Sequence, residues 1–508
     1  MPFKSKISPS RHVALWILLF IIISSLAVRS YHLTSRSLWF DEAFSWRLIQ
    51  FSNTEMLTRA AADVHPPLYY LVLKAWSFIF GSTLLSLRSF SVVAALLTIA
   101  ASYLFTTYAT SSRKVGLAAA LLLTVSGFQI QYAQEARMYT LGTALLLLSS
   151  YLLLKAVRES SLKYWLAYAV TASALIYTHY FALFSLAGHF VFLFGYIVHR
   201  TKGRLGEILS WRQVWHALLA AFLILVFFLP WLPTFLKQNA QVQQNYWIPP
   251  IGGWSVPDSF YRMFVPTVTI PIHTGLGWLL LAAAPIFLTI IGWILLVKKP
   301  EGWLVMLSGF IPFFITIILS FTSQSLYQDR FFIFAHVFIV IGLAMLIFRL
   351  RPAWLKYLVL SLITVVLIIT SYYYWLELDI PNKPGAHAAT SYIFENRQAD
   401  EPIIVSSPFV FFAIDHYAQE NFNTGAVTHL YSETEELLHF AGGPILSAED
   451  LVSSEIFKSD TDTIWIVDTT GFGESSLIPP SPWQPNLTQT YPEVFPYQGE
   501  VLVTRYSR

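Results

Sequence analysis

Long apolar runs constrain this chain more than any other feature of its sequence. A membrane-spanning helix needs about 20 mostly apolar residues. Runs of that kind lie near 13–28, 86–108, 115–130, 138–154, 164–178, 181–198, 214–233, 275–297, 302–320, 331–348 and 355–375. With 55% hydrophobic and 12% charged residues, the chain of 508 residues is too apolar for a soluble enzyme. The sequence therefore predicts a polytopic α-helical membrane protein with about 11 transmembrane helices.

The apolar stretch "PLYYLVLKAWSFIF" at 67–80 differs from these runs because it is shorter and carries Lys74. We expect it to form a helix on the membrane surface within the first outer loop. The first apolar run is not followed by a small-residue cleavage site, so we interpret it as an anchor and not as a removed signal peptide. The chain has 0 cysteines, which excludes disulfides, thiolate metal sites and a Cys nucleophile.

Charge divides the chain near residue 376. Residues up to Leu376 hold 27 Lys and Arg against 10 Asp and Glu, whereas the remainder holds 5 against 19. We therefore predict a transmembrane domain over 1–376 and a soluble domain over 377–508. Because the basic residues lie in short loops between apolar runs, they do not indicate a nucleic-acid partner.

The acidic remainder has the pattern of a small α/β domain. "PIIVSS" and "TDTIWIVDTT" predict short buried strands, and "HAATSYIFENRQ" predicts an amphipathic helix. Strands that alternate with helices are typical of α/β domains. The proline-rich stretch "IPPSPWQPN" is expected to break regular structure.

Lys and Arg gather in alternate loops, which indicates the orientation of the chain in the membrane. If the N-terminus is cytoplasmic, the inner loops hold most of the basic residues of 1–376, and the outer loops hold most of its acids. With 11 spans, about the number predicted above, the acidic domain then lies outside the cytoplasm.

Sorted by side, the unusual polar residues fall almost entirely in the outer loops. The first outer loop, about 29–85, contains "WFDEAF" and "ADVHPPLYY"; later ones contain "QIQYAQEARMY", "YTHYF" and "SQSLYQDRFF". These segments supply the candidate site residues Asp41, Glu42, His65, Glu135, Arg137, Tyr139, His179, Asp329 and Arg330.

These residue types suit one reaction. A carboxylate can take a proton from a hydroxyl or amine while that group attacks. An arginine can hold a phosphate through two hydrogen bonds. A polar cavity at the membrane surface can admit a lipid tail sideways. Together they favour transfer of a sugar from a lipid phosphate to an acceptor. Since phosphate is a good leaving group, a single base suffices, unlike the carboxylate pair of most glycoside hydrolases.

Several segments also carry a family resemblance. "FDEA", then "HPPLYYLVLKAW" and "LRSFSVVAALLTIAASYLF", then "QEARMYTLGTALLLLSSYLLLKA", resemble the membrane glycosyltransferases of the C superfamily. The most similar members are bacterial relatives of protein O-mannosyltransferases and of the lipid A aminoarabinose transferase. The resemblance covers about 30–155 in sequence and the rest through topology. It implies a polyprenyl-phosphate sugar donor, a lipid, glycan or protein acceptor, an inverting reaction and a soluble outer domain.

The resemblance also implies roles for individual residues. The acid of the first loop, Asp41, contacts the acceptor and acts as the base or assists it, with Glu42 beside it. The position before "PP", here His65, lies near the donor phosphate. The resemblance implies a lysine at this position in the aminoarabinose transferases. The histidine found here can be neutral at pH 7, unlike a lysine. Arg137 is therefore a second candidate for the phosphate contact.

Each candidate also has a purely structural interpretation. Asp41 and Glu42 favour the start of a helix over "AFSWRLIQF", since acids stabilise helix N-termini. His65 precedes two prolines and can simply set an extended turn. His179 can pack among its neighbouring tyrosines. The other charged residues can be rim charges or ion pairs at the membrane surface: Glu135, Arg137, Asp329 and Arg330.

Two further questions stay open at the level of sequence. Asp41, Glu42 and His65 could together bind a divalent metal ion, although their spacing matches no recognised ligand motif. The alternatives to an enzyme are a transporter or flippase for polyprenyl lipids or small molecules and a scaffold that presents the acidic domain. Transporters place charges near the bilayer midplane, whereas here they lie at one end of the spans. We expect a bacterial inner membrane, with an archaeal membrane or the endoplasmic reticulum as alternatives.

Overall fold

The computed structural model describes residues 10–244, 246–266, 290–292, 294–422, 428–434, 437–494 and 499–508. Contacts divide the chain into two compact units. The first unit comprises Met1–Tyr31 and Ser89–Glu377, and the second comprises His32–Arg88 and Leu378–Arg508. The first outer loop therefore folds together with the C-terminal residues, although more than half of the chain separates them in sequence.

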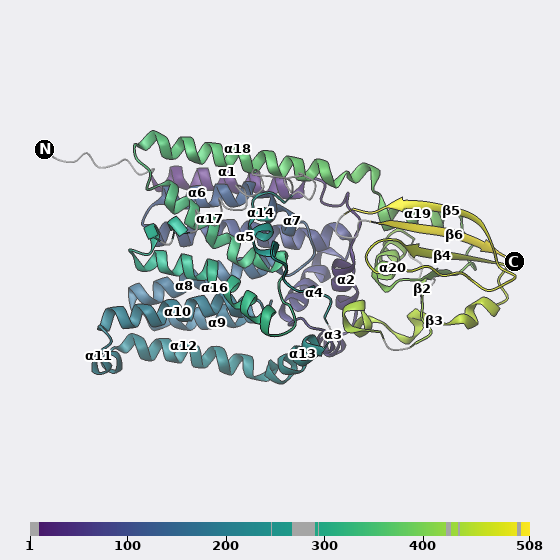
Figure 1. Ribbon diagram of the computed structural model, residues 1–508, viewed down its shortest axis with the longest axis horizontal. Coiled ribbons are helices and arrows are strands. Elements are labelled where there is room, and N and C mark those ends of the chain that lie inside the picture. Colours follow the sequence, from purple (N-terminus) through teal and green to yellow (C-terminus); the bar gives the residue numbers. More distant parts are fainter. Residues whose placement is uncertain are drawn as a thin grey trace. The chain divides into compact units, whose positions relative to one another are not determined.

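The first unit is a bundle of helices whose long members run roughly along one direction (Figure 1). Its helices are α1 (Arg11–Ser30), most of α5 (Leu84–Thr110), α6 (Arg113–Val125), α7 (Gly127–Ala133), α8 (Tyr139–Glu159), α9 (Leu162–Ile176), α10 (Ala182–Thr201), α11 (Leu205–Ser210), α12 (Arg212–Phe228), η1 (Leu229–Trp231), α13 (Leu232–Gln244), α14 (Ser255–Arg262), α16 (Pro300–Thr322), η2 (Asp329–Phe332), α17 (Ile333–Ile347) and α18 (Ala353–Leu378).

Within the described residues, 8 helical segments are long and apolar enough to cross a membrane, and the bent pair α6 and α7 raises this to 9. Helix α9 has only 15 residues. The run predicted at 275–297 lies mostly outside the described residues. The predicted polytopic helical membrane protein is confirmed, and a helix occupies each of the other predicted runs.

Small residues bring the helices of this bundle close together. A Cβ atom added at Gly188 of α10 would lie 3.0 Å from the carbonyl oxygen of Leu307 in α16, so only glycine permits this approach. Such close contacts are the usual way in which transmembrane helices pack, because lipid tails are as apolar as the side chains.

The second unit combines a mixed β-sheet with helices from both of its sequence segments. The first outer loop forms α2 (Phe40–Gln50), α3 (Asn53–Ala62) and α4 (Leu68–Phe80). The C-terminal part contributes η3 (Ile380–Asn382), α19 (Gly385–Asn396), β1 (Ile403–Val405), α20 (Pro408–Phe422), β2 (Thr428–Tyr431), η4 (His439–Ala441), η5 (Gly443–Ile445), η6 (Ala448–Asp450), β3 (Leu451–Val452), η7 (Ser454–Lys458), β4 (Thr463–Thr469), β5 (Gln484–Pro492) and β6 (Glu500–Ser507).

The strands lie in the order β3-β2-β1-β4-β6-β5. Strands β3, β2, β1 and β4 are parallel, whereas β6 and β5 pair in the antiparallel sense. Strands β1 and β4 are buried along nearly their whole length, which explains why they read as continuous apolar runs. The predicted small α/β domain is confirmed, including the strands in "PIIVSS" and "TDTIWIVDTT" and the helix in "HAATSYIFENRQ".

The prediction for "IPPSPWQPN" is wrong in its last three residues, because β5 begins at Gln484. Strand β5 lies at one end of the sheet order, and its ladder shifts register between Pro485 and Leu487. An edge strand with an irregular register tolerates a proline, which has no N–H group to donate.

Candidate functional site

Asp41 lies in the first turn of α2, next to the N-terminal end of that helix. Trp39 precedes the helix without a capping side chain, whereas apolar side chains such as Phe44 and Leu48 are buried and hold the helix in the fold. Asp41 itself is partly exposed. Since the N-terminus of a helix carries a partial positive charge, this position favours the ionised carboxylate.

Glu42, the neighbour of Asp41, has a different environment. Its side chain is 0% exposed, and that of Arg88 is 1% exposed. Arg88 donates from Nε to Oε1 at 2.8 Å and from Nη2 to Oε2 at 2.7 Å. The same guanidinium also donates to the carbonyl oxygens of Leu33, Arg36 and Ser37. This geometry suits a buried ion pair that shapes the first outer loop.

His65 lies in the turn between α3 and α4, where its ring nitrogen Nδ1 is 2.6 Å from Oδ2 of Asp63. The carboxylate of Asp63 is buried, and the imidazole is partly exposed. A carboxylate at Nδ1 fixes the ring orientation and favours the tautomer with its proton on that nitrogen. The second ring nitrogen, Nε2, is then an acceptor in the neutral form and a donor in the protonated form.

Glu135 and Arg137 lie in the turn between α7 and α8, and both are buried, at 5% and 2% exposure. The Arg137 N–H donates to the Glu135 carbonyl oxygen at 2.8 Å, which closes a tight turn. Two buried charges this close to the membrane-spanning helices differ from the rim charges that the structural interpretation proposed. Ionisable groups buried within such bundles are most often functional.

Tyr139 and His179 meet next to this turn. Their ring centroids are 5.9 Å apart, and Tyr139 also contacts Tyr132 at 5.2 Å. His179 is buried against Phe331 and Phe334, each at 5.3 Å. The Phe181 N–H donates to Nδ1 of His179 at 3.1 Å, so a neutral His179 carries its proton on Nε2.

Asp329 and Arg330 form the start of η2, next to Phe331. The Ser259 hydroxyl donates to Oδ1 of Asp329, and Nε of Arg262 lies 3.5 Å from Oδ2. The guanidinium of Arg330 lies 5.0 Å from the ring centroid of Trp247. A guanidinium over an indole face is a favourable cation–π contact.

The first unit thus gathers five of the predicted residues around Tyr132: Glu135, Tyr139, His179, Asp329 and Arg330. Arg137, the sixth, stands in the same turn as Glu135. Two acids and a cation from two separate turns interact electrostatically with the hydroxyl of Tyr132: Glu135, Asp329 and Arg330. The other three predicted residues, Asp41, Glu42 and His65, belong to the second unit.

Three contributors were missed by the sequence reasoning: Asp63, Arg88 and Arg262. Asp63 had a signal, since it stands only two residues before His65. Arg88 also had one, because a cation at the edge of an apolar run is costly unless it is paired. Arg262 had a signal for its local pair with Asp258, four residues earlier, but none for Asp329, which lies far away in sequence.

Whether a metal ion could bind here depends on which side chains can supply its ligands. In the part of the chain that the structure describes, no three His, Asp or Glu side chains gather as a metal ion would require. For the set Asp41, Glu42 and His65, both carboxylate oxygens of Glu42 accept hydrogen bonds from Arg88. The residues present therefore do not fit a metal ion held by this set.

Comparison with known proteins adds to this geometry. Residues 64–233 match the family model described as dolichyl-phosphate-mannose-protein mannosyltransferase. The fold matches the crystal structure of ArnT from Cupriavidus metallidurans, with a TM-score of 0.59 and 14% identity over 97% of this chain and 98% of that one. A second structure of that protein, bound to undecaprenyl phosphate, gives a TM-score of 0.57 and 12% identity over 96% of this chain and 98% of that one.

The archaeal oligosaccharyltransferase AglB from Archaeoglobus fulgidus, solved with an inhibitory peptide and a dolichol-phosphate, matches with a TM-score of 0.52 and 12% identity. That match covers 90% of this chain and 69% of the other. No curated protein sequence matches this chain. The chain thus has the fold of ArnT. The predicted resemblance is confirmed by this fold and by the family model, whose match includes most of "HPPLYY".

Proposed function

We propose that this protein is an integral membrane glycosyltransferase that moves a sugar from a polyprenyl-phosphate donor to an acceptor, with inversion at the sugar carbon. The acceptor is a lipid, a glycan or a protein at the extracytoplasmic face. The membrane is the inner membrane of a bacterium. The domain over 377–508 stands on the same outer side as the first outer loop.

Asp41 is the base in this proposal. It takes the proton of the acceptor hydroxyl or amine as that group attacks the sugar carbon, while the bond from this carbon to the phosphate oxygen breaks. The observation that carries this role is the contrast between two neighbouring acids. Both oxygens of Glu42 accept from Arg88 in a buried pair, whereas Asp41 is partly exposed at a helix N-terminus. Glu42 assists by fixing the loop that carries Asp41.

The phosphate of the donor needs cationic partners as charge develops on it. We assign this role to Arg137, with His65 as a second contact when its ring is protonated. Tyr139, His179, Glu135, Asp329 and Arg330 belong to the first unit, as Arg137 does, and we assign them to binding of the same donor. Two relatives of the same fold are described as bound to undecaprenyl phosphate and to a dolichol-phosphate, which supports a polyprenyl-phosphate ligand.

The proposal is tested by a transfer assay on the full chain in nanodiscs, with a panel of labelled polyprenyl-phosphate sugars and a membrane extract as acceptor. Wild-type protein should transfer sugar, and Asp41→Asn should reduce turnover by about 10²- to 10⁴-fold, the usual contribution of a positioned base. Asp460→Asn is the matched control because Asp460 is an exposed carboxylate of the C-terminal domain. Full activity in Asp41→Asn would move the base elsewhere.

A further inference from the structure

Helix α2, which carries Asp41, packs against the C-terminal part of its own unit at both ends. Before its first turn, the Leu38 N–H donates to the Tyr417 hydroxyl at 2.7 Å. The Phe40 ring lies 4.9 Å from that of Phe409. In its last turn, the Trp46 ring meets His416 edge to face at 4.9 Å. All three partners lie on α20, so one helix of the C-terminal domain supports the whole length of α2.

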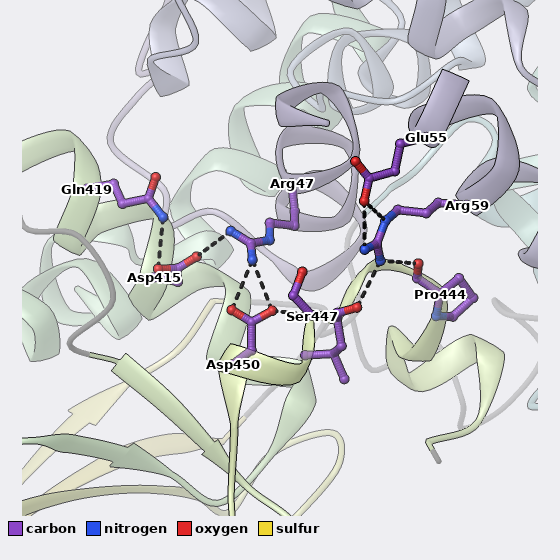
Figure 2. Close-up of polar contacts among 9 residues, drawn as sticks. Arg47, Glu55, Arg59, Asp415, Gln419, Pro444, Ser447 and Asp450 are labelled. Atoms are coloured by element: carbon purple, nitrogen blue, oxygen red, sulfur yellow. Dashed lines mark hydrogen bonds and ion pairs between the residues drawn. The ribbon is translucent and has the colours of Figure 1, made fainter. Parts of the chain in front are cut away.

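Arg47 adds an ionic contact to this apolar one (Figure 2). Its Nη2 donates to both carboxylate oxygens of Asp450 at 2.9 Å, and its Nη1 lies 3.6 Å from Oδ2 of Asp415. The three side chains are between 10% and 14% exposed. One guanidinium therefore bridges two acids from separate elements, η6 and α20.

Both acids are held in place by their own neighbours. The Ser447 N–H donates to Oδ2 of Asp450 at 2.7 Å, as part of a capping box at the start of η6. The Gln419 amide donates to Oδ1 of Asp415 at 3.0 Å. Burial raises the pKa of Asp415, while Gln419 and Arg47 act in the opposite direction. Both acids that contact Arg47 therefore also accept hydrogen bonds from within the C-terminal part.

The next helix of the loop is fixed in a similar way. Arg59 of α3 donates to the carbonyl oxygens of Pro444 at 2.9 Å and Leu446 at 2.8 Å. Its guanidinium also lies 3.9 Å from the centroid of the Phe51 ring and pairs with Glu55 (Figure 2). The segment 444–450 therefore receives an arginine from each of two consecutive loop helices.

These contacts matter for Asp41 because α2 is short. Asp41 and Arg47 stand six residues apart, or about 9 Å along a helix that rises about 1.5 Å per residue. Over two turns a helix behaves as a rigid body, so fixing Arg47 fixes the place of Asp41. A displacement of about 1 Å in a catalytic group can reduce a rate by about 10²-fold.

We propose that Arg47 is a positioning residue, through which the C-terminal domain holds α2 so that Asp41 meets the acceptor in one fixed place. The C-terminal domain is then a working part of the catalytic centre and not an appended module. This inference rests on the proposed function for its effect on catalysis, and on the contacts alone for its effect on α2.

The test compares Arg47→Met with Lys458→Met in the full chain in nanodiscs. Lys458 forms an ion pair with Glu455 within the same domain, but at 72% and 73% exposure. Hydrogen exchange over residues 40–50 and steady-state turnover are measured on both variants. In Arg47→Met, exchange over 40–50 should accelerate and kcat should fall about 10- to 100-fold, while the KM for the donor stays within about twofold because ground-state binding of the donor is unchanged. Lys458→Met should match wild type in every readout.

A charge-swapped pair, Arg47→Asp with Asp450→Arg, should recover part of both losses relative to Arg47→Asp alone. If Arg47→Met does not accumulate, Asp450→Asn weakens the same contact and takes its place. The inference is overturned if hydrogen exchange over residues 40–50 is as slow in Arg47→Met as in wild type. It is also overturned if exchange is faster in Arg47→Met but kcat is unchanged. If wild-type protein transfers no sugar at all, the proposed function fails, whereas the exchange comparison still decides whether Arg47 holds α2.

Discussion

At the scale of single residues, two adjacent carboxylates of α2 differ in their burial, and we propose separate tasks for them. Both carboxylate oxygens of Glu42 accept hydrogen bonds from Arg88, 46 residues later in the chain, whereas Asp41 is partly exposed. The sequence predicted that the two acids belong to the site from their place in the first outer loop and from the family resemblance that "FDEA" carries. It did not predict how they differ, because the partner of Glu42 lies in another helix.

The buried pair of Arg88 and Glu42 leads to a prediction about the stability of the fold. Arg88→Met leaves the Glu42 carboxylate in the interior without its cation, and breaking a buried pair in this way costs about 3–5 kcal/mol. Lys458→Met breaks an exposed pair and should cost no more than about 1 kcal/mol. Thermal unfolding of the full chain in detergent measures both. Equal unfolding midpoints for the two variants would contradict a structural role for the Arg88–Glu42 pair.

At the scale of elements, the start of α19 contains a pH-sensitive contact. Glu493 follows β5, and its Oε1 accepts from the Ala386 N–H at 3.2 Å. Burial raises the pKa of Glu493 to about 7, although this hydrogen bond acts in the opposite direction. Gly385, the residue before Ala386, has a φ of +55°, and a Cβ atom added to it would lie 3.0 Å from Oε1 of Glu493. Glycine therefore permits the close approach.

The raised pKa determines how stability depends on pH. In the folded state Glu493 keeps its proton up to about pH 7, whereas in the unfolded chain it loses the proton near its ordinary pKa of 4.5. The contribution of Glu493 to the stability of the fold is therefore full below about pH 4.5 and declines as the pH rises through about 7. The total change is about 3 kcal/mol. The unfolding midpoint of wild type should therefore fall between pH 5 and pH 8, and Glu493→Gln should flatten this dependence. Identical pH profiles for the two proteins would show that Glu493 is not the titrating group.

The elements also show which parts of the fold the sequence reveals. Apolar runs predicted the helices of the first unit, and the largely buried strands β1 and β4 were recognised from their apolar stretches. Strands β2, β3, β5 and β6 were missed because they are partly exposed and lack that pattern. The docking of α2 on α20 has no local signal, since it depends on contacts between segments that are more than 350 residues apart.

At the scale of the whole molecule, the orientation of the chain determines which side of the membrane holds the site. The alternation of basic loops predicts that the C-terminal domain and the first outer loop lie outside the cytoplasm. The absence of cysteine from the sequence permits a direct test. Single cysteines at exposed positions can be labelled without background.

Asp460→Cys, in the C-terminal domain, should react with a membrane-impermeant maleimide in intact cells. Lys163→Cys, in the first turn of α9, should react only after permeabilisation. Both positions are exposed in the structure. The reverse pattern would place the C-terminal domain in the cytoplasm and remove the outward-facing site from the account.

The most direct test of the central claim follows both halves of the donor. Full-length protein in proteoliposomes receives a polyprenyl-phosphate sugar that is labelled in the sugar and, separately, in the lipid. We predict that wild type releases free polyprenyl phosphate in step with sugar transfer to the acceptor, and that Asp41→Asn binds the donor but does neither. Movement of intact donor across the bilayer, without release of polyprenyl phosphate, would contradict the account and identify a transporter instead.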